Sequence, residues 1–117
     1  MKKTEIKDRV VIEYNFGVVG EIRNVQPKHE NAESISFDIF ILEEQKMVTG
    51  FEAPSALADS ARILSELEIR EEGSKILASQ QAGIESAEAV VQNLSDNKKH
   101  LSVWLERRWE EYTKSKQ

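Results

Sequence analysis

The sequence contains no cysteine, and histidine, proline and tryptophan occur only twice each in 117 residues. Without cysteine there are no structural disulfides, no thiolate zinc site and no cysteine nucleophile, and this composition agrees with a reducing compartment. No apolar stretch approaches the roughly 20 residues of a membrane span, and the first residues, from Met1 to Arg9, do not read as a signal peptide. We therefore expect a cytoplasmic protein that is not bound to a membrane.

Residues that could catalyse a reaction or hold a metal are scattered. His29 and His100 lie in unrelated segments without the spacing of a metal site. Adjacent glutamates such as Glu71 and Glu72 point to different sides of a helix or strand, so they do not face each other as an acid–base pair. The sequence therefore predicts no metal site, no cofactor and no catalytic residue, and we expect a binding protein rather than an enzyme.

Charge is distributed unevenly along the chain, which carries a net charge of −5. From Lys98 to the C-terminus there are six Lys or Arg and three Glu, a local net charge of +3, which leaves −8 for residues 1–97. A net-acidic chain binds nucleic acid poorly without sequence specificity, whereas a local basic patch can hold a small anion. The acidic remainder favours an alternative, a protein–protein interaction module or inhibitor with an acidic surface.

The first half of the chain has the patterns of β-strands. Residues 34–43 alternate cleanly, with Ile35, Phe37, Ile39 and Ile41 on one face. Gly20 interrupts an apolar run and predicts a bulge or a close approach of another backbone. Four strands are expected, at residues 9–15, 18–26, 34–43 and 47–51, with a mobile loop at residues 27–33. Together they form a four-stranded antiparallel β-meander.

The second half has the patterns of helices. A short helix should begin at Pro54-Ser55 and end near Gly73. From Ser74 to Lys116 the sequence has no proline, and heptads with Leu77 at position a place mostly apolar residues at a and d, apart from Lys98 at a and Gln80 and Arg108 at d. One helix of about 40 residues would be about 60 Å long, longer than such a sheet can cover. Either it breaks near Ser95-Asp96-Asn97, or it pairs with another chain.

The predicted fold is therefore α+β, a single domain over residues 1–117. Its sheet part is residues 1–53, and its helical part, residues 54–117, holds a short helix followed by a long C-terminal helix or helical hairpin. Because the apolar stripe from Leu77 to Leu105 exceeds what the sheet can cover, we predict a homo-oligomer built on a dimer.

The segment from Val103 to Tyr112 concentrates both tryptophans, two arginines and a tyrosine on about three helical turns. On a helix Trp104 neighbours Arg107 and Arg108, and Arg108 neighbours Tyr112. Arginine beside an aromatic ring stacks on planar bases and clamps phosphates, and the same composition is found in protein–protein hot spots. A third interpretation is structural, with the tryptophans covering a neighbouring helix and the arginines paired with nearby glutamates. The sequence leaves all three open.

The layout of a β-meander, long helices and arginines near the C-terminus resembles the small phage-encoded sponge proteins that sequester cyclic ADP-ribose signals of the Thoeris defence system. The resemblance covers architecture, charge and size across the chain. It implies an oligomer in the host cytoplasm that holds a cyclic nucleotide or ADP-ribose-type molecule between subunits without cleaving it. It also implies that Arg107 and Arg108, with Arg23 or Asn93, contact the phosphate and ribose. From the composition of the segment itself, Trp104 or Tyr112 would supply the stacking face for such a ligand.

Overall fold

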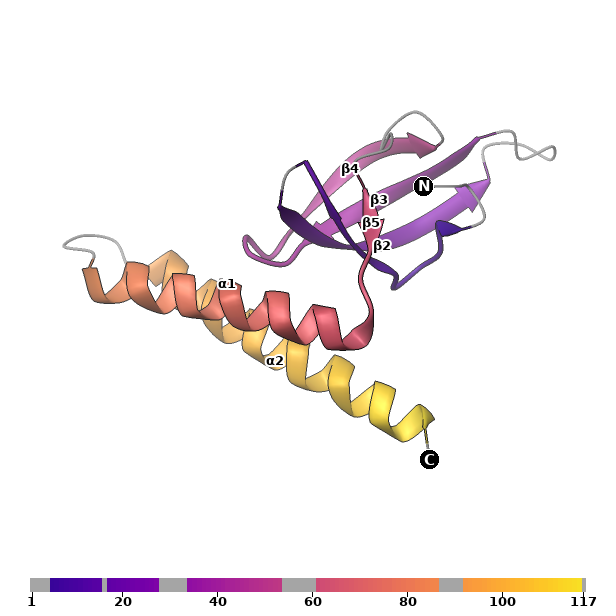
Figure 1. Ribbon diagram of the computed structural model, residues 1–117. Coiled ribbons are helices and arrows are strands. Elements are labelled where there is room, and N and C mark those ends of the chain that lie inside the picture. The colour runs from indigo at the N-terminus through magenta and orange to yellow at the C-terminus, as the bar shows by residue number, and fades with distance from the viewer. Residues whose placement is uncertain (1–4, 16, 28–33, 54–60, 87–91, 117) are drawn as a thin grey trace. The chain divides into compact units, whose positions relative to one another are not determined.

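The computed structural model of the chain describes residues 5–15, 17–27, 34–53, 61–86 and 92–116. The fold is α+β, as predicted, with an antiparallel sheet and two helices (Figure 1). The chain divides into a sheet unit, residues 1–42 and 46–64, and a helical unit, residues 43–45 and 65–117. The boundary expected after residue 53 therefore lies after residue 64. Neither described helix is long and apolar enough to cross a membrane.

The sheet has five strands in the order β4-β3-β2-β1-β5, each antiparallel to its neighbours. Their bounds are β1 Val11–Tyr14, β2 Val18–Pro27, β3 Ile35–Ile41, β4 Lys46–Ala53 and β5 Arg62–Ile63. The four predicted strands are confirmed. The fifth, which pairs with β1 through Ile12 and Ile63, has only two residues, too few to show a period of two in the sequence.

The core of the sheet unit is formed by side chains from one face of the central strands. Phe37, Ile39 and Ile41 of β3 are buried, and the alternate residues Asp38 and Phe40 are half-buried, so the predicted alternation is confirmed. The Phe37 ring stacks on Phe51 of β4, with centroids 5.6 Å apart. The buried cluster comprises Ile6, Ile12, Tyr14, Ile22, Phe37, Ile39 and Ile41.

Gly20 and the bulge in β2 occupy different positions. A Cβ atom at Gly20 would collide with the Ile39 side chain and stand 3.1 Å from the Phe40 carbonyl oxygen, so the predicted close approach of another backbone is confirmed. The register shifts further along the strand, between Arg23 and Gln26, where Asn24 adopts a φ of 57°. Asparagine tolerates this left-handed conformation better than most residues. Of the predicted loop, Pro27 ends β2, and residues 28–33 lie outside the described residues.

The first helix begins later than the sequence suggested. The predicted helix from Pro54-Ser55 to Gly73 is wrong, because residues 62–63 form β5 and α1 spans Glu66–Ser86. Residues 54–60 lie outside the described residues. Ser65 and Glu68 form a capping box that begins α1: each backbone N–H donates to the other's side chain, at 3.0 and 3.2 Å.

Gly73 lies inside α1 and does not end it. Its position is buried against Leu105 of α2, and a Cβ atom there would stand 2.6 Å from both Leu105 methyl carbons. The glycine therefore allows the two helices to approach closely, so here it has a packing role and not the role of a helix stop.

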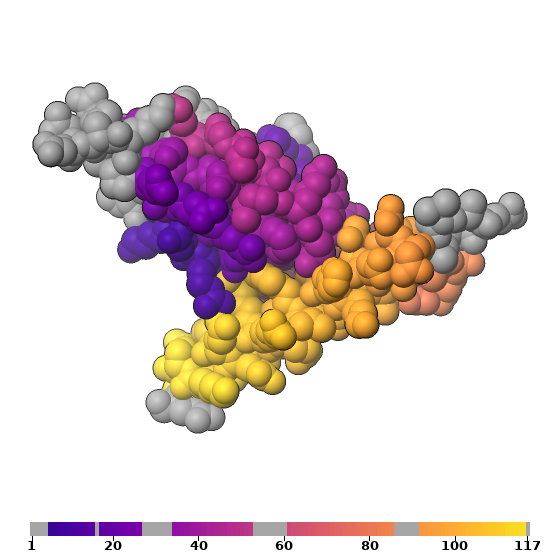
Figure 2. Space-filling view, turned by 180° about the vertical axis from the view of Figure 1, so that it is seen from behind, coloured from indigo at the N-terminus to yellow at the C-terminus, as the bar shows by residue number. Residues whose placement is uncertain are grey.

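The second helix, α2, spans Gln92–Ser115 and runs antiparallel to α1 (Figure 1). Gly83 near the end of α1 lies beside Leu94 near the start of α2, and these ends appear side by side in Figure 2. The predicted break is confirmed, but it precedes Ser95-Asp96-Asn97: α1 ends at Ser86, α2 begins at Gln92, and these three residues lie inside α2. Their polar side chains suit the start of a helix, and Asp96 accepts a hydrogen bond from Gln92 at 2.9 Å.

The apolar stripe that suggested an oligomer is largely used within the chain. Leu101 and Leu105 are buried, and Leu105 and Leu94 pack on the glycines of α1. Of the two alternatives for the long helical stretch, the structure contains the hairpin. The homo-oligomer stays a prediction.

Candidate functional site

Arg108, the arginine at a heptad core position, has an acidic partner within the hairpin. Its Nε donates to one carboxylate oxygen of Glu66 at 3.1 Å and its Nη2 to the other at 2.9 Å. The two side chains are 13% and 24% exposed. The guanidinium also lies 5.6 Å from the centre of the Trp104 ring. A two-point ion pair between α1 and α2 therefore explains this charged residue without a ligand.

The other aromatic residues of α2 are also engaged by neighbours in the helical unit. The Arg70 guanidinium lies 4.5 Å from the centre of the Trp109 ring, and Tyr112 lies 5.4 Å from Trp109 between ring centroids. The Lys116 ammonium lies 5.3 Å from the Tyr112 ring. These rings and cations form a series of cation–π contacts along the hairpin. The sequence suggested Arg108 as the neighbour of Tyr112, but its neighbours in this series are Trp109 and Lys116.

The remaining predicted contact residues lie apart. Arg107 and Asn93 are both exposed on α2, but 14 residues separate them, about 21 Å along a helix. Arg23 belongs to the sheet unit, where it pairs with Glu21 at 2.6 Å and lies 4.0 Å from the centre of the Phe40 ring. The helical unit therefore does not gather the six predicted residues into one site.

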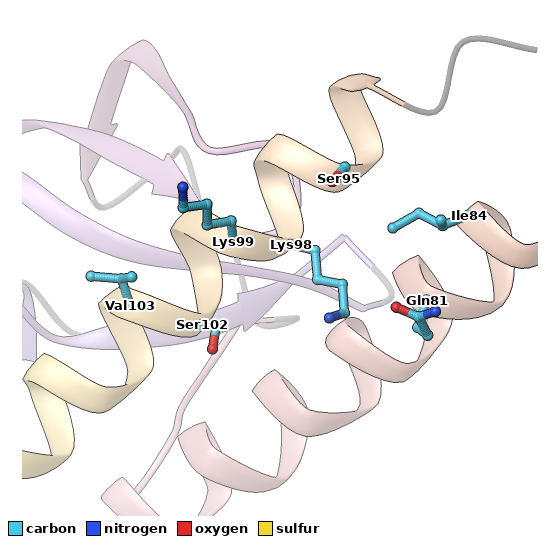
Figure 3. Close-up of a pocket in the computed structure, with 7 residues that line it drawn as sticks. All are labelled: Gln81, Ile84, Ser95, Lys98, Lys99, Ser102 and Val103. Atoms are coloured by element: carbon cyan, nitrogen blue, oxygen red, sulfur yellow. The ribbon is translucent and has the colours of Figure 1, made fainter.

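A different set of residues lines a groove between the C-terminal half of α1 and the N-terminal half of α2 (Figure 3). Its volume is about 400 Å³, within the range of small-molecule sites, about 300–1,000 Å³. Two of the lining residues come from α1 and five from α2: Gln81, Ile84, Ser95, Lys98, Lys99, Ser102 and Val103.

The spacing of residues on α2 explains how the groove is built. Ser95, Lys98 and Ser102 recur at intervals of three and four, so they share one face of the helix. Lys98 is half-buried and Lys99 is exposed. In Figure 3 the Lys98 side chain extends toward α1 beside Gln81, whereas Lys99 and Val103 leave the other side of α2. Lys98 is therefore the charge inside the groove, and Lys99 is a charge at its rim.

The groove is rich in hydrogen-bond donors. Among the described residues that line it, none carries a carboxylate, and within the described part of the chain neither Lys98 nor Lys99 forms an ion pair. The nearest acid along α1 is Glu85, which accepts a hydrogen bond from Gln81 at 3.0 Å. Two ammonium groups, two serine hydroxyls and an amide suit an anion with several oxygen atoms.

A smaller cavity continues the same seam between the helices. It shares Ser102 with the groove and measures about 60 Å³, room for a few water molecules only. Its lining includes Arg70 and Glu106, so both signs of charge are present there. The groove at Lys98 is therefore the better candidate for a ligand site.

Sequence reasoning missed this site although a signal was present. Lys98 occupies a heptad a position, which faces a partner helix, and serines stand three residues before it and four after it. Small serine side chains beside a lysine leave space on a helix face that apolar residues usually fill. They also place hydrogen-bond donors in that space. The aromatic and arginine content of the segment from Val103 to Tyr112 is more conspicuous, but the hairpin's own contacts account for much of it.

Within the described residues no group of three or more His, Asp or Glu lies close enough to hold a metal ion. Comparisons with models of protein families, with curated proteins and with solved structures found no match to this chain.

Proposed function

We propose that this protein is a non-catalytic binding protein that holds a small anionic molecule in the groove between α1 and α2, with Lys98 as the main charged contact. The observation that carries the proposal is the half-buried residue Lys98, whose side chain extends into a groove of about 400 Å³ (Figure 3). Its charge has no carboxylate partner in the described part of the chain.

The expected energetics are those of a weak to moderate binding site. A hydrogen bond between an ammonium and an anionic oxygen contributes about 1.5–3 kcal/mol, which is about 10- to 150-fold in affinity. Ser95 and Ser102 add neutral donors one turn on either side of Lys98. Lys98 binds the anionic group, and the serines bind other polar groups of the same molecule, which fixes its orientation. The proposed role is to hold the molecule unchanged.

The proposal keeps only the anionic character of the ligand that the resemblance to nucleotide sponges implies, and it moves the site. A ligand at Arg108 would have to compete with the two hydrogen bonds from Glu66, and a ligand at Trp109 would have to displace Arg70. A ligand at Lys98 would not have to break an ion pair within the described part of the chain. The anion site is therefore better placed in the N-terminal half of α2.

The alternative, an acidic interaction module, has a different location from the one that the sequence suggested. The residues of the sheet unit include eight Lys or Arg and nine Asp or Glu, so this unit is nearly neutral. Acidic residues gather on α1, which carries five glutamates and two basic residues. A basic protein partner would therefore bind α1, with exposed Glu71 and Glu85 as contacts.

The proposal is tested by titrating the protein, labelled with ¹⁵N, with inorganic phosphate at constant ionic strength. We expect saturable shifts of the amides of Ser95, Lys98 and Ser102 on α2 and of Gln81 and Ile84 on α1. A bound phosphorylated compound should be recovered unchanged, as followed by ³¹P NMR. Shifts confined to Arg107–Tyr112, or no saturable shift, would contradict the proposed site.

A further inference from the structure

We infer that the groove takes a phosphorylated sugar or polyol and does not recognise a nucleobase. This inference rests on the proposed function and narrows the ligand of the same site. It follows from three features of the helical unit: the side chains that line the groove, the position of the aromatic rings on α2, and the size of the groove.

The first feature is the character of the lining. Among the described lining residues there is no aromatic ring, and the aliphatic side chains are Ile84 on α1 and, at the rim of the groove, Val103 on α2 (Figure 3). A nucleobase is usually held by stacking, which contributes about 5- to 150-fold in affinity per base. Aliphatic walls give a base no such platform, so a base in the groove would gain little over a sugar alone.

The second feature is the placement of the aromatic rings of α2. Trp104 lies six residues after Lys98, which places it about 120° away around the helix. Trp109 is already covered by Arg70, and its ring lies tilted against Tyr112. The rings that could stack on a base therefore do not face the groove, and a base attached to a phosphate at Lys98 would not reach them without bending away from the seam.

The third feature is the match between the groove's polar groups and a polyol. Ser95 and Ser102 stand about 10 Å apart along the helix, on either side of Lys98. A serine hydroxyl both donates and accepts hydrogen bonds, and the hydroxyl groups of a sugar do the same. A volume of about 400 Å³ lies near the lower end of the range for small-molecule sites, which suits one phosphorylated sugar better than two linked nucleotides.

The test compares four probes under one set of conditions: inorganic phosphate, ribose 5-phosphate, AMP and adenosine. Affinities are measured from the amide shifts of Ser95, Lys98 and Ser102. Each added hydroxyl contact contributes about 2- to 10-fold, so ribose 5-phosphate should bind at least about threefold more tightly than inorganic phosphate. AMP should bind within about threefold of ribose 5-phosphate, since the base adds no stacking contact. Adenosine should show no saturable shift.

A variant separates recognition of the sugar from recognition of the phosphate. Ser102 is exposed, so Ser102→Ala should leave the melting temperature unchanged. It should reduce the affinity for ribose 5-phosphate about threefold, the effect of one neutral hydrogen bond, and leave the affinity for inorganic phosphate nearly unchanged.

The possible failures are distinguishable. If no anion binds, the proposed function and this inference both fail. If anions bind but AMP binds more than about tenfold more tightly than ribose 5-phosphate, a stacking contact of the usual size is present. The proposed function then stands, and the inference is overturned. Equal affinities for inorganic phosphate and ribose 5-phosphate, or saturable binding of adenosine, would also overturn it.

Discussion

Gly73 illustrates how one missing side chain sets the distance between two helices. Glycine costs a helix about 1 kcal/mol relative to alanine, so Gly73→Ala would stabilise α1 if nothing stood in the way. Leu105 blocks the substitution, because the new Cβ atom would lie 2.6 Å from both Leu105 methyl carbons. Overpacking of this kind costs about 1–3 kcal/mol. We expect Gly73→Ala to lower the free energy of unfolding by about 1 kcal/mol, measured by urea denaturation.

Gly83 supplies the matched control in the same helix. A Cβ atom there would stand 3.3 Å from one Leu94 methyl carbon, which a small shift of the leucine relieves. Gly83→Ala should therefore be neutral or stabilise the protein by up to about 1 kcal/mol. Equal effects of the two substitutions would show that the contact with Leu105 does not limit how closely the helices approach.

Lys98 and Arg108 show what a sequence reveals at the scale of one residue. Both are charged residues at heptad core positions, so both can be identified as exceptions from spacing alone. Their different explanations depend on the partner helix. Glu66 is 42 residues from Arg108 in sequence and pairs with it, whereas the residues of α1 that line the groove beside Lys98 are Gln81 and Ile84. A sequence pattern cannot supply that distinction, because it requires the register of α1 against α2.

At the scale of elements, the Arg108–Glu66 pair holds the open end of the hairpin. Because both side chains are less than one quarter exposed, we expect a coupling free energy of roughly 1–2 kcal/mol, above that of most surface pairs. A double-mutant cycle with Arg108→Ala and Glu66→Ala, read by urea denaturation, measures it. Arg108→Lys keeps the charge but loses the two-point contact, so it should recover only part of the stability.

The same variants separate a structural arginine from a ligand contact. Arg108→Ala should leave the affinity for inorganic phosphate nearly unchanged, because the groove lies nearer the other end of α2. A loss of affinity of about tenfold or more with an unchanged free energy of unfolding would make Arg108 a ligand contact, as the resemblance to nucleotide sponges implies.

The type of most elements could be predicted from the sequence, and some of their ends could not. The alternation in β3 is a local pattern, and it correctly identified the buried residues. The start of α1 was misplaced because Pro54-Ser55 and Ser65–Glu68 both look like helix starts, and the sequence alone does not choose between them. The end at Gly73 was wrong because glycine can stop a helix or permit close packing, and the choice depends on Leu105.

At the scale of the whole molecule, the homo-oligomer depends on exposed apolar residues of the helical unit. Leu67 is 64% exposed on α1 and Val103 is 43% exposed on α2. Neither belongs to the heptad stripe, whose Leu101 and Leu105 are buried in the hairpin. We predict a dimer at tens of micromolar, observed as twice the chain mass of 13.4 kDa by sedimentation equilibrium. Leu67→Glu should shift the protein toward the monomer without lowering its melting temperature at low concentration. A strict monomer at that concentration would refute the prediction.

The central claim is that Lys98 is the main charged contact for an anion, and a pair of neighbouring substitutions tests it most directly. Lys98→Gln and Lys99→Gln remove the same charge from adjacent positions of α2, one inside the groove and one at its rim. In phosphate titrations at constant ionic strength, Lys98→Gln should weaken binding by about tenfold or more, and Lys99→Gln by about threefold or less, since an exposed charge is screened. Equal losses, or a larger loss from Lys99→Gln, would contradict the account.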